Sequence, residues 1–187
     1  MTTGKKTLGI LVGSLRRDSF CKRVANYMSG LMGEEFEVKF LDISNLAMYN
    51  EDLDNEKDIP PEWLRLRQDV KALDAVLFVT PEYNRSVSPV LKNAMDIASR
   101  PYGAGVWSGK PGSVISVSPG NLGGYGANQH LRQIAACIGI NMMLQPEAYI
   151  GGIINSVDDN TVVNKNLQDF LKLFANAFSA WINRFTA

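Results

Sequence analysis

The sequence has few of the residues from which disulfide frameworks and zinc sites are built. Among its 187 residues there are two cysteines, Cys21 and Cys137, and a single histidine, His130. Two cysteines cannot form a disulfide framework or a four-cysteine metal site, and one histidine excludes a multi-histidine zinc centre. We therefore expect no metal site in this protein.

An excess of one charge and long apolar runs are lacking as well. The 19 basic residues balance the 19 acidic ones, so no overall field attracts nucleic acid or an anionic membrane. No apolar run approaches the roughly 20 residues that span a bilayer. The apolar stretch at residues 8–12 is shorter than the core of a signal peptide and is soon followed by arginines. We expect a cytoplasmic protein with neither nucleic-acid nor membrane partners.

Short β-rich runs alternate along the chain with segments of helical periodicity. Hydrophobic residues make up 45% of the sequence and charged residues 20%, as in a globular protein with a sizeable core. The apolar runs predict strands at residues 7–12, 36–41, 75–80 and 112–118, and a weaker fifth at 142–150 that Pro146 interrupts. Apolar positions three and four apart predict helices at residues 21–32, 63–73, 89–98, 127–138 and 167–182.

This alternation predicts a single α/β domain, residues 1–187, with a parallel sheet. The first and third strands are apolar throughout, as strands covered on both faces are. Right-handed crossovers leave two main candidates, a flavodoxin-like order 2-1-3-4-5 and a Rossmann half. In both, ligands bind beyond the carboxyl ends of the strands, which directs attention to three loops.

The first loop, GSLRRDSF at residues 13–20, has the composition of an anion site. Ser14 and Ser19 offer hydroxyls, Arg16 or Arg17 could bind a phosphate bidentately, and the next helix contributes free N–H groups and its dipole. The alternative is a plain helix cap, which explains Ser19 but not the arginine pair. Neither a P-loop nor a G-x-G-x-x-G turn is present, so Asp42, placed like a Rossmann ribose acid, gives little support for that fold. A phosphate monoester fits best.

The second loop, residues 81–96, follows the third strand. Pro81 and Asn84 interrupt that strand, and Tyr83 offers an aromatic face on which a flat heteroaromatic ring can stack. The alternative is an ordinary strand-to-helix connection. Lys92 and Asn93, on the helix that follows, are expected on a solvated or interface face.

The third loop, residues 118–133, follows the fourth strand and is rich in glycine. Gly120, Gly123, Gly124 and Gly126 lose more entropy on folding than other residues would. We interpret them as positions where the backbone approaches a ligand or adopts positive φ. An unstructured linker is less favoured, because a strand and a helix flank the segment.

Taken in order, the stretches GSLRRDSF, TPEYNRSVSPVLKNAMDIASR and SPGNLGGYGANQHLRQ resemble the NAD(P)H-dependent FMN reductase family. Within it the chain is most similar to soluble bacterial quinone reductases, also called chromate reductases. The resemblance runs from the first strand to about Gly152. It implies a flavodoxin-like three-layer fold with helices on both faces of a five-stranded sheet, tightly bound FMN, and a homodimer or homotetramer.

The resemblance also implies a set of cofactor-binding residues. Side chains of the first loop would surround the FMN phosphate, those of the second would line the isoalloxazine ring, and Ser118 with the glycines after it would close the other side. The family often has asparagine where this chain has Cys21. The residues so implied are Gly13, Ser14, Arg16, Ser19, Phe20, Pro81, Glu82, Tyr83, Asn84, Ser118, Gly120, Gly123 and Gly124.

With FMN in these loops the chemistry needs no catalytic side chain. NADH or NADPH would deliver hydride to flavin N5, and a small-molecule quinone would then take the same place, which predicts ping-pong kinetics. Chromate and other acceptors would be side substrates. Two other classes stay open, a flavodoxin-type electron carrier and a non-catalytic flavin-binding protein.

The patterns assign the remaining notable residues no part in flavin binding. We expect Cys21 to be a buried packing thiol rather than a redox group, and His130 to have a structural or interface role. Tyr102 and Trp107, in the stretch at residues 100–107, would shape either the acceptor pocket or an oligomer interface.

Overall fold

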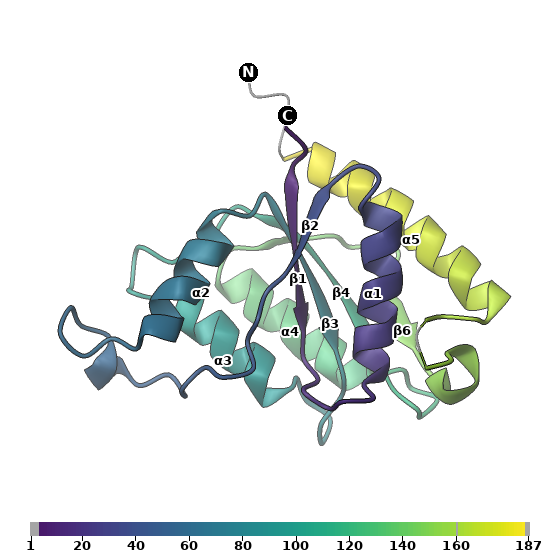
Figure 1. Ribbon diagram of the computed structural model, residues 1–187, viewed down its shortest axis with the longest axis horizontal. Coiled ribbons are helices and arrows are strands. Elements are labelled where there is room, and N and C mark those ends of the chain that lie inside the picture. The colour runs from purple at the N-terminus through teal and green to yellow at the C-terminus, as the bar shows by residue number, and fades with distance from the viewer. Residues whose placement is uncertain (1–3, 160, 186–187) are drawn as a thin grey trace.

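The computed structural model describes residues 4–159 and 161–185. Its centre is a parallel sheet in the order β2-β1-β3-β4-β5, with a further strand, β6, also paired with β4 (Figure 1). The strands are β1 (Thr7–Val12), β2 (Glu37–Phe40), β3 (Ala75–Thr80), β4 (Pro111–Val117), β5 (Asn141–Met142) and β6 (Ala148–Ile150). The predicted strand order 2-1-3-4-5 is confirmed, and the Rossmann alternative is excluded.

The expectation of one interrupted fifth strand is wrong in detail. Two short strands occupy that position: β5 pairs with the start of β4, Gly112 opposite Met142, and β6 with its end, Ile115 opposite Ala148. Pro146 lies between them and has no N–H to donate to a ladder. The strand is therefore divided where proline cannot pair.

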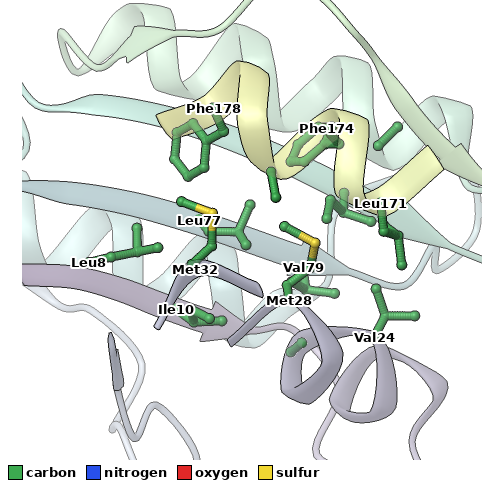
Figure 2. Close-up of a cluster of buried hydrophobic side chains, with 14 of the residues drawn as sticks. Leu8, Ile10, Val24, Met28, Met32, Leu77, Val79, Leu171, Phe174 and Phe178 are labelled. Carbon is green, nitrogen blue, oxygen red and sulfur yellow. The ribbon is translucent and has the colours of Figure 1, made fainter. Parts of the chain in front are cut away.

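Helices α1 (Phe20–Met32) and α5 (Lys165–Asn183) cover one face of the sheet. In Figure 2, Met28 of α1 and Phe174 and Phe178 of α5 point toward Leu77 and Val79 of β3. All these side chains are fully buried. The apolar spacing that predicted the two helices thus forms their contact with the sheet.

Helices α2 (Pro61–Lys71), α3 (Pro89–Ala98) and α4 (Tyr125–Cys137) cover the opposite face (Figure 1). Trp63, Leu91 and Leu131, one from each helix, belong to a second buried cluster with Phe78 of β3. Every residue of β3 is buried, which confirms that this strand is covered on both sides. Two 3-10 turns, Glu51–Leu53 and Ile153–Ser156, complete the described elements.

The long connection from β2 to α2 is held by polar contacts. The Asn93 side chain on α3 accepts a hydrogen bond from Tyr49 N (2.8 Å) and donates one to Ala47 O (3.0 Å). Asp54 receives two hydrogen bonds from Arg67 of α2, each 2.8 Å long. The expectation that Asn93 lies on a solvated or interface face is wrong, because the residue is only 4% exposed and its amide pairs with the backbone of the loop that packs on it.

The stretch after α3 lies at the amino-terminal edge of the sheet. Helix α3 starts at the carboxyl end of β3 and runs back across the sheet, so the residues between its end and β4 are at the opposite edge from the three loops. Trp107 is fully buried, and its Nε1 donates to Met95 O (3.0 Å). Trp107 is therefore a core residue and fits neither the acceptor pocket nor an oligomer interface, whereas the role of Tyr102, which is 92% exposed, stays a prediction.

Candidate functional site

The three loops meet at the carboxyl edge of the sheet around a hollow of about 180 Å³. Parallel strands all end at this edge, so loops far apart in the sequence become neighbours there. Residues from every one of the loops line the hollow: Ser14, Arg16, Ser19, Phe20, Cys21, Pro81, Glu82, Tyr83, Val117, Ser118 and Pro119.

The β1–α1 turn presents unused hydrogen-bond donors to this hollow. Ser14 is only 6% exposed, and no hydrogen bond involves its hydroxyl within residues 4–159 and 161–185. Across the same part of the chain, no backbone N–H from residue 14 to residue 18 donates a hydrogen bond. Residues 15–18 of the turn are exposed. Unused donors gathered at a helix N-terminus in this way fit an anion, which would accept their hydrogen bonds.

Ser19 both caps α1 and lines the hollow. Its Oγ accepts a hydrogen bond from Lys22 N (3.3 Å), so the side chain acts as an N-cap while its hydroxyl proton stays free to donate. The plain-cap alternative is therefore true of Ser19 without excluding an anion. The positive end of the α1 dipole faces the same space.

Two guanidinium groups add positive charge beside the turn. Arg16 and Arg23 lie over the Phe20 ring, 5.1 and 5.5 Å from its centroid. Cys21 also lines the hollow but is 2% exposed, and burial raises the pKa of its thiol to about 12. The expectation of a buried packing thiol is confirmed, because a thiol with this pKa does not form a reactive thiolate near neutral pH.

The loop after β3 is built around a tight two-residue turn. Tyr83 and Ser86 exchange backbone hydrogen bonds of 3.0 Å, and the residues between them, Asn84 and Arg85, have φ values of 49° and 67°. Both angles lie in the left-handed region, where asparagine is tolerated better than most residues. This turn leaves the Tyr83 side chain 47% exposed beside the hollow.

Two contacts attach this loop to α4. Glu82 Oε2 accepts a hydrogen bond from Ala127 N (3.2 Å), and Ser86 Oγ and His130 Nδ1 are hydrogen-bonded at 2.9 Å. Glu82 also pairs with Arg85 at 3.4 Å. His130 thereby joins the loop to the helix, and its structural or interface role stays a prediction.

In the glycine-rich loop after β4, contacts within the protein explain why two positions are glycine. Gly123 and Gly124 have φ values of 59° and 75°. A Cβ on Gly123 would lie 2.5 Å from the Tyr149 carbonyl carbon, and one on Gly124 would lie 3.0 Å from Ser116 Cβ. The positive φ expected there is confirmed, and backbone packing accounts for it. Gly120 is held by its N–H, which donates to Ser118 Oγ (3.1 Å).

The structure brings most of the sequence-predicted site residues to the hollow, with a few exceptions. Gly13 packs beneath it, where a Cβ would lie 2.6 Å from Ser88 Oγ and from Leu91 Cδ1, and Asn84 forms the tip of its turn. Predicted residues absent from the lining are Gly13, Asn84, Gly120, Gly123 and Gly124. Sequence reasoning missed Val117 and Pro119, although both adjoin Ser118.

Other kinds of site find no support in the part of the chain that the structure describes. No group of three or more histidine, cysteine, aspartate or glutamate side chains there could hold a metal ion. Among the same residues, no helix has both the length and the apolar character needed to cross a bilayer.

The fold and the turn after β1 define a class, the flavodoxin-like proteins that hold a flavin phosphate at the carboxyl edge of a parallel sheet. Comparison with known sequences identifies the family. The sequence model of the NADPH-dependent FMN reductases matches residues 6–154, and the chain belongs to that family.

Individual relatives agree along almost the whole chain. A quinone reductase of Pseudomonas putida is 46% identical, with 94% of each chain covered. A 2-hydroxy-1,4-benzoquinone reductase of a Burkholderia species is 42% identical, covering 94% of this chain and 95% of its own. Among solved structures, FerB of Paracoccus denitrificans, described as a flavoenzyme NAD(P)H:(acceptor) oxidoreductase, has a TM-score of 0.89 at 40% identity and covers 96% of this chain and 98% of its own.

The family and the site agree on cofactor and donor. The protein is an oxidoreductase that uses FMN and takes its electrons from NAD(P)H. The unpaired Ser14 hydroxyl, the free N–H groups of the turn and the nearby guanidinium groups are the donors that a phosphate monoester requires.

Proposed function

We propose that this protein is an FMN-dependent NAD(P)H oxidoreductase that reduces quinones by two electrons. The observation that carries the proposal is that the unpaired Ser14 hydroxyl and Arg16 line one hollow together with the half-exposed Tyr83. One end of the hollow can therefore bind a phosphate, and the other can contact the aromatic ring of the same ligand. The quinone reductases among the relatives support the choice of acceptor.

Each loop takes one part of the cofactor in this proposal. Ser14, Arg16, Ser19 and Phe20 hold the phosphate, with Gly13 allowing α3 to pack closely beneath the turn. Pro81, Glu82, Tyr83 and Asn84 border the ring on one side. Ser118 and Gly120 border it on the other, in a loop whose path Gly123 and Gly124 make possible.

Bound FMN supplies hydride acceptance from NAD(P)H and hydride donation to the acceptor. The protein binds and orients, and no side chain is assigned a catalytic role. In this proposal nicotinamide and quinone use the same open side in turn, which predicts ping-pong kinetics, and the half-exposed Tyr83 at the mouth of the hollow supports such access. An open site of this kind also admits chromate and other small acceptors.

We further propose that residues 1–187 form one domain, located in the cytoplasm, that assembles as a homodimer or homotetramer. An apolar hollow of about 530 Å³ beside α3 and α4 supports the assembly, since Val87, Pro89 and Ile134 line it next to His130. Light scattering of the purified protein measures the mass directly, and a monomer at micromolar concentration would contradict this part.

Stopped-flow spectroscopy tests the function. Reduction of the purified flavoprotein by NADH or NADPH, followed by rapid reoxidation with free quinones, is the expected result, with parallel lines in double-reciprocal plots. A flavodoxin-type electron carrier would react slowly with both nicotinamides. A non-catalytic flavin-binding protein would retain FMN, but neither nicotinamide would reduce it.

A further inference from the structure

A second hollow, of about 370 Å³, lies on the other side of the β1–α1 turn, between α1 and the carboxyl end of β2. Ser14 lines both this hollow and the one proposed to hold the FMN phosphate. A ligand whose phosphate sits at the turn can therefore extend in two directions. One leads to the loops around Tyr83, and the other leads into the second hollow.

The walls of the second hollow have the chemistry of a nucleoside site. Leu15 and Phe40 both line it and are each 48% exposed, so two large apolar side chains face the same open space. Pockets for flat organic groups combine apolar walls of this kind with a few placed polar groups. Such walls fit a purine base.

Asp42 and Lys22 supply the polar groups. Asp42 Oδ1 accepts hydrogen bonds from Ser44 N (2.9 Å) and Ser44 Oγ (2.6 Å), which hold the pKa of the carboxyl below its usual range. Its second oxygen receives no hydrogen bond within the described residues and is free for ribose hydroxyls. In the same part of the chain nothing pairs with the Lys22 ammonium, which is free for a second phosphate.

We propose that the second hollow binds the adenosine monophosphate half of FAD, so that this chain accepts FAD as well as FMN. The inner phosphate would occupy the turn at Ser14 and the outer one would lie near Lys22. The ribose would meet Asp42, and the adenine would lie against Leu15 and Phe40. The proposal rests on the proposed flavin site and extends it by one nucleotide.

Isothermal titration of the deflavinated full-length chain with FMN and with FAD tests this. In the unsubstituted protein we expect the Kd for FAD to equal or fall below that for FMN. Asp42→Asn and Phe40→Ala should each raise the ratio of the FAD Kd to the FMN Kd by about tenfold, since only FAD reaches these side chains. Lys39→Ala is the matched control, because Lys39 is exposed on the same strand outside the hollow, and it should leave the ratio unchanged.

The outcomes separate this inference from the function on which it rests. If the protein binds FMN but binds FAD more than tenfold more weakly, the FAD assignment alone is overturned. The same holds if Asp42→Asn and Phe40→Ala leave the ratio of the FAD Kd to the FMN Kd unchanged. A rise confined to the KM for NAD(P)H would assign the hollow to the donor's adenosine, and a loss of oligomer mass in Phe40→Ala would assign it to a second copy; either overturns the proposal. Failure to bind both flavins overturns the proposed function as well.

Discussion

The Glu82 carboxylate accepts a hydrogen bond from the backbone N–H of Ala127, with 3.2 Å between Oε2 and N. Glu82 follows β3, whereas Ala127 lies in the first turn of α4, which follows β4. A carboxylate at a helix N-terminus satisfies a free N–H group and interacts favourably with the helix dipole. This contact therefore fixes two loops of the site relative to each other.

Removing that carboxylate should loosen both loops. We expect Glu82→Ala to lower the free energy of unfolding by about 1 kcal/mol and to weaken FMN binding. Glu82→Gln keeps an oxygen that can accept from Ala127 N and should recover most of both losses. Urea unfolding and fluorescence titration with FMN measure the two effects. An alanine variant equal to the unsubstituted protein in both would show that the contact positions nothing.

The two adjacent arginines of the β1–α1 turn should differ in their effect on FMN. Arg16 lines the hollow and Arg17 does not. Losing a hydrogen bond to a charged group costs about 1.5 to 3 kcal/mol, so Arg16→Ala should raise the Kd for FMN about tenfold or more. Arg17→Ala is the control and should change it less than about twofold. Adding Ser19→Ala should raise the Kd further while far-UV circular dichroism stays the same. Equal effects of the two arginines would contradict the site assignment.

The ion pair between Arg67 and Asp54 should stabilise the protein in a pH-dependent way. Their side chains are only 11% and 7% exposed, and the two hydrogen bonds from Arg67 hold the pKa of Asp54 below its usual range. Asp54→Asn removes the negative charge that is paired with the largely buried Arg67 guanidinium and should cost roughly 3 kcal/mol at pH 7. Because the folded pKa lies below the unfolded value of about 4, this difference persists above pH 5 and shrinks as pH falls through the folded pKa.

Urea unfolding between pH 3 and pH 7 checks the pH dependence. The exposed pair of Lys92 with Asp96 provides the control. Asp96→Asn should change the free energy of unfolding by less than about 1 kcal/mol at any of these pH values. A constant difference between Asp54→Asn and the unsubstituted protein from pH 7 to pH 3 would argue against the ion pair as its source.

Trp107 should affect stability and leave the acceptor site untouched. It is fully buried at the edge of the sheet away from the three loops. Trp107→Ala removes a large core side chain and should lower the free energy of unfolding by about 3 to 5 kcal/mol. The KM for quinone, measured below the melting temperature, should stay the same. Tyr102, which is 92% exposed, is the control, and Tyr102→Ala should leave stability within about 0.5 kcal/mol. A changed KM in Trp107→Ala would connect this stretch to catalysis after all.

Cys21 should be inert in the folded protein despite its place beside the phosphate turn. With its pKa raised to about 12, almost no thiolate exists at pH 8. In a Cys137→Ser background, iodoacetamide should leave the native protein unmodified and should label Cys21 fully in urea. Rapid labelling of the native protein would assign Cys21 a reactivity that its burial excludes.

Local patterns were enough to predict the architecture. β3 is apolar at nearly every position, and in the sequence a segment of helical periodicity precedes it and another follows it. This pattern predicted a central strand covered on both faces. The prediction that the β1–α1 turn binds an anion followed from its hydroxyls, its arginines and the helix after it. These features depend on residues that are close together in the sequence, so a local sequence pattern is sufficient to predict them.

Contacts between distant segments could not be predicted in this way. Asn93 reads as one polar residue on an amphipathic helix, and only the loop that packs on it makes it buried. In the sequence Trp107 is an aromatic residue in a glycine-containing loop. Only the folded structure shows that β3 and α3 enclose it. In both cases the partner is a backbone or side chain far away in the chain.

The sequence by itself determined the alternation of strands and helices and the chemistry of each loop, because periodicity and turn composition are properties of consecutive residues. The tertiary structure alone decided how the last sheet position is divided between β5 and β6, which loop residues face one hollow, and that Ser14 borders a second one beside Asp42. Those outcomes depend on how far apart strand ends and helix starts lie in space, and that spacing is set by the packing of both helical layers on the sheet.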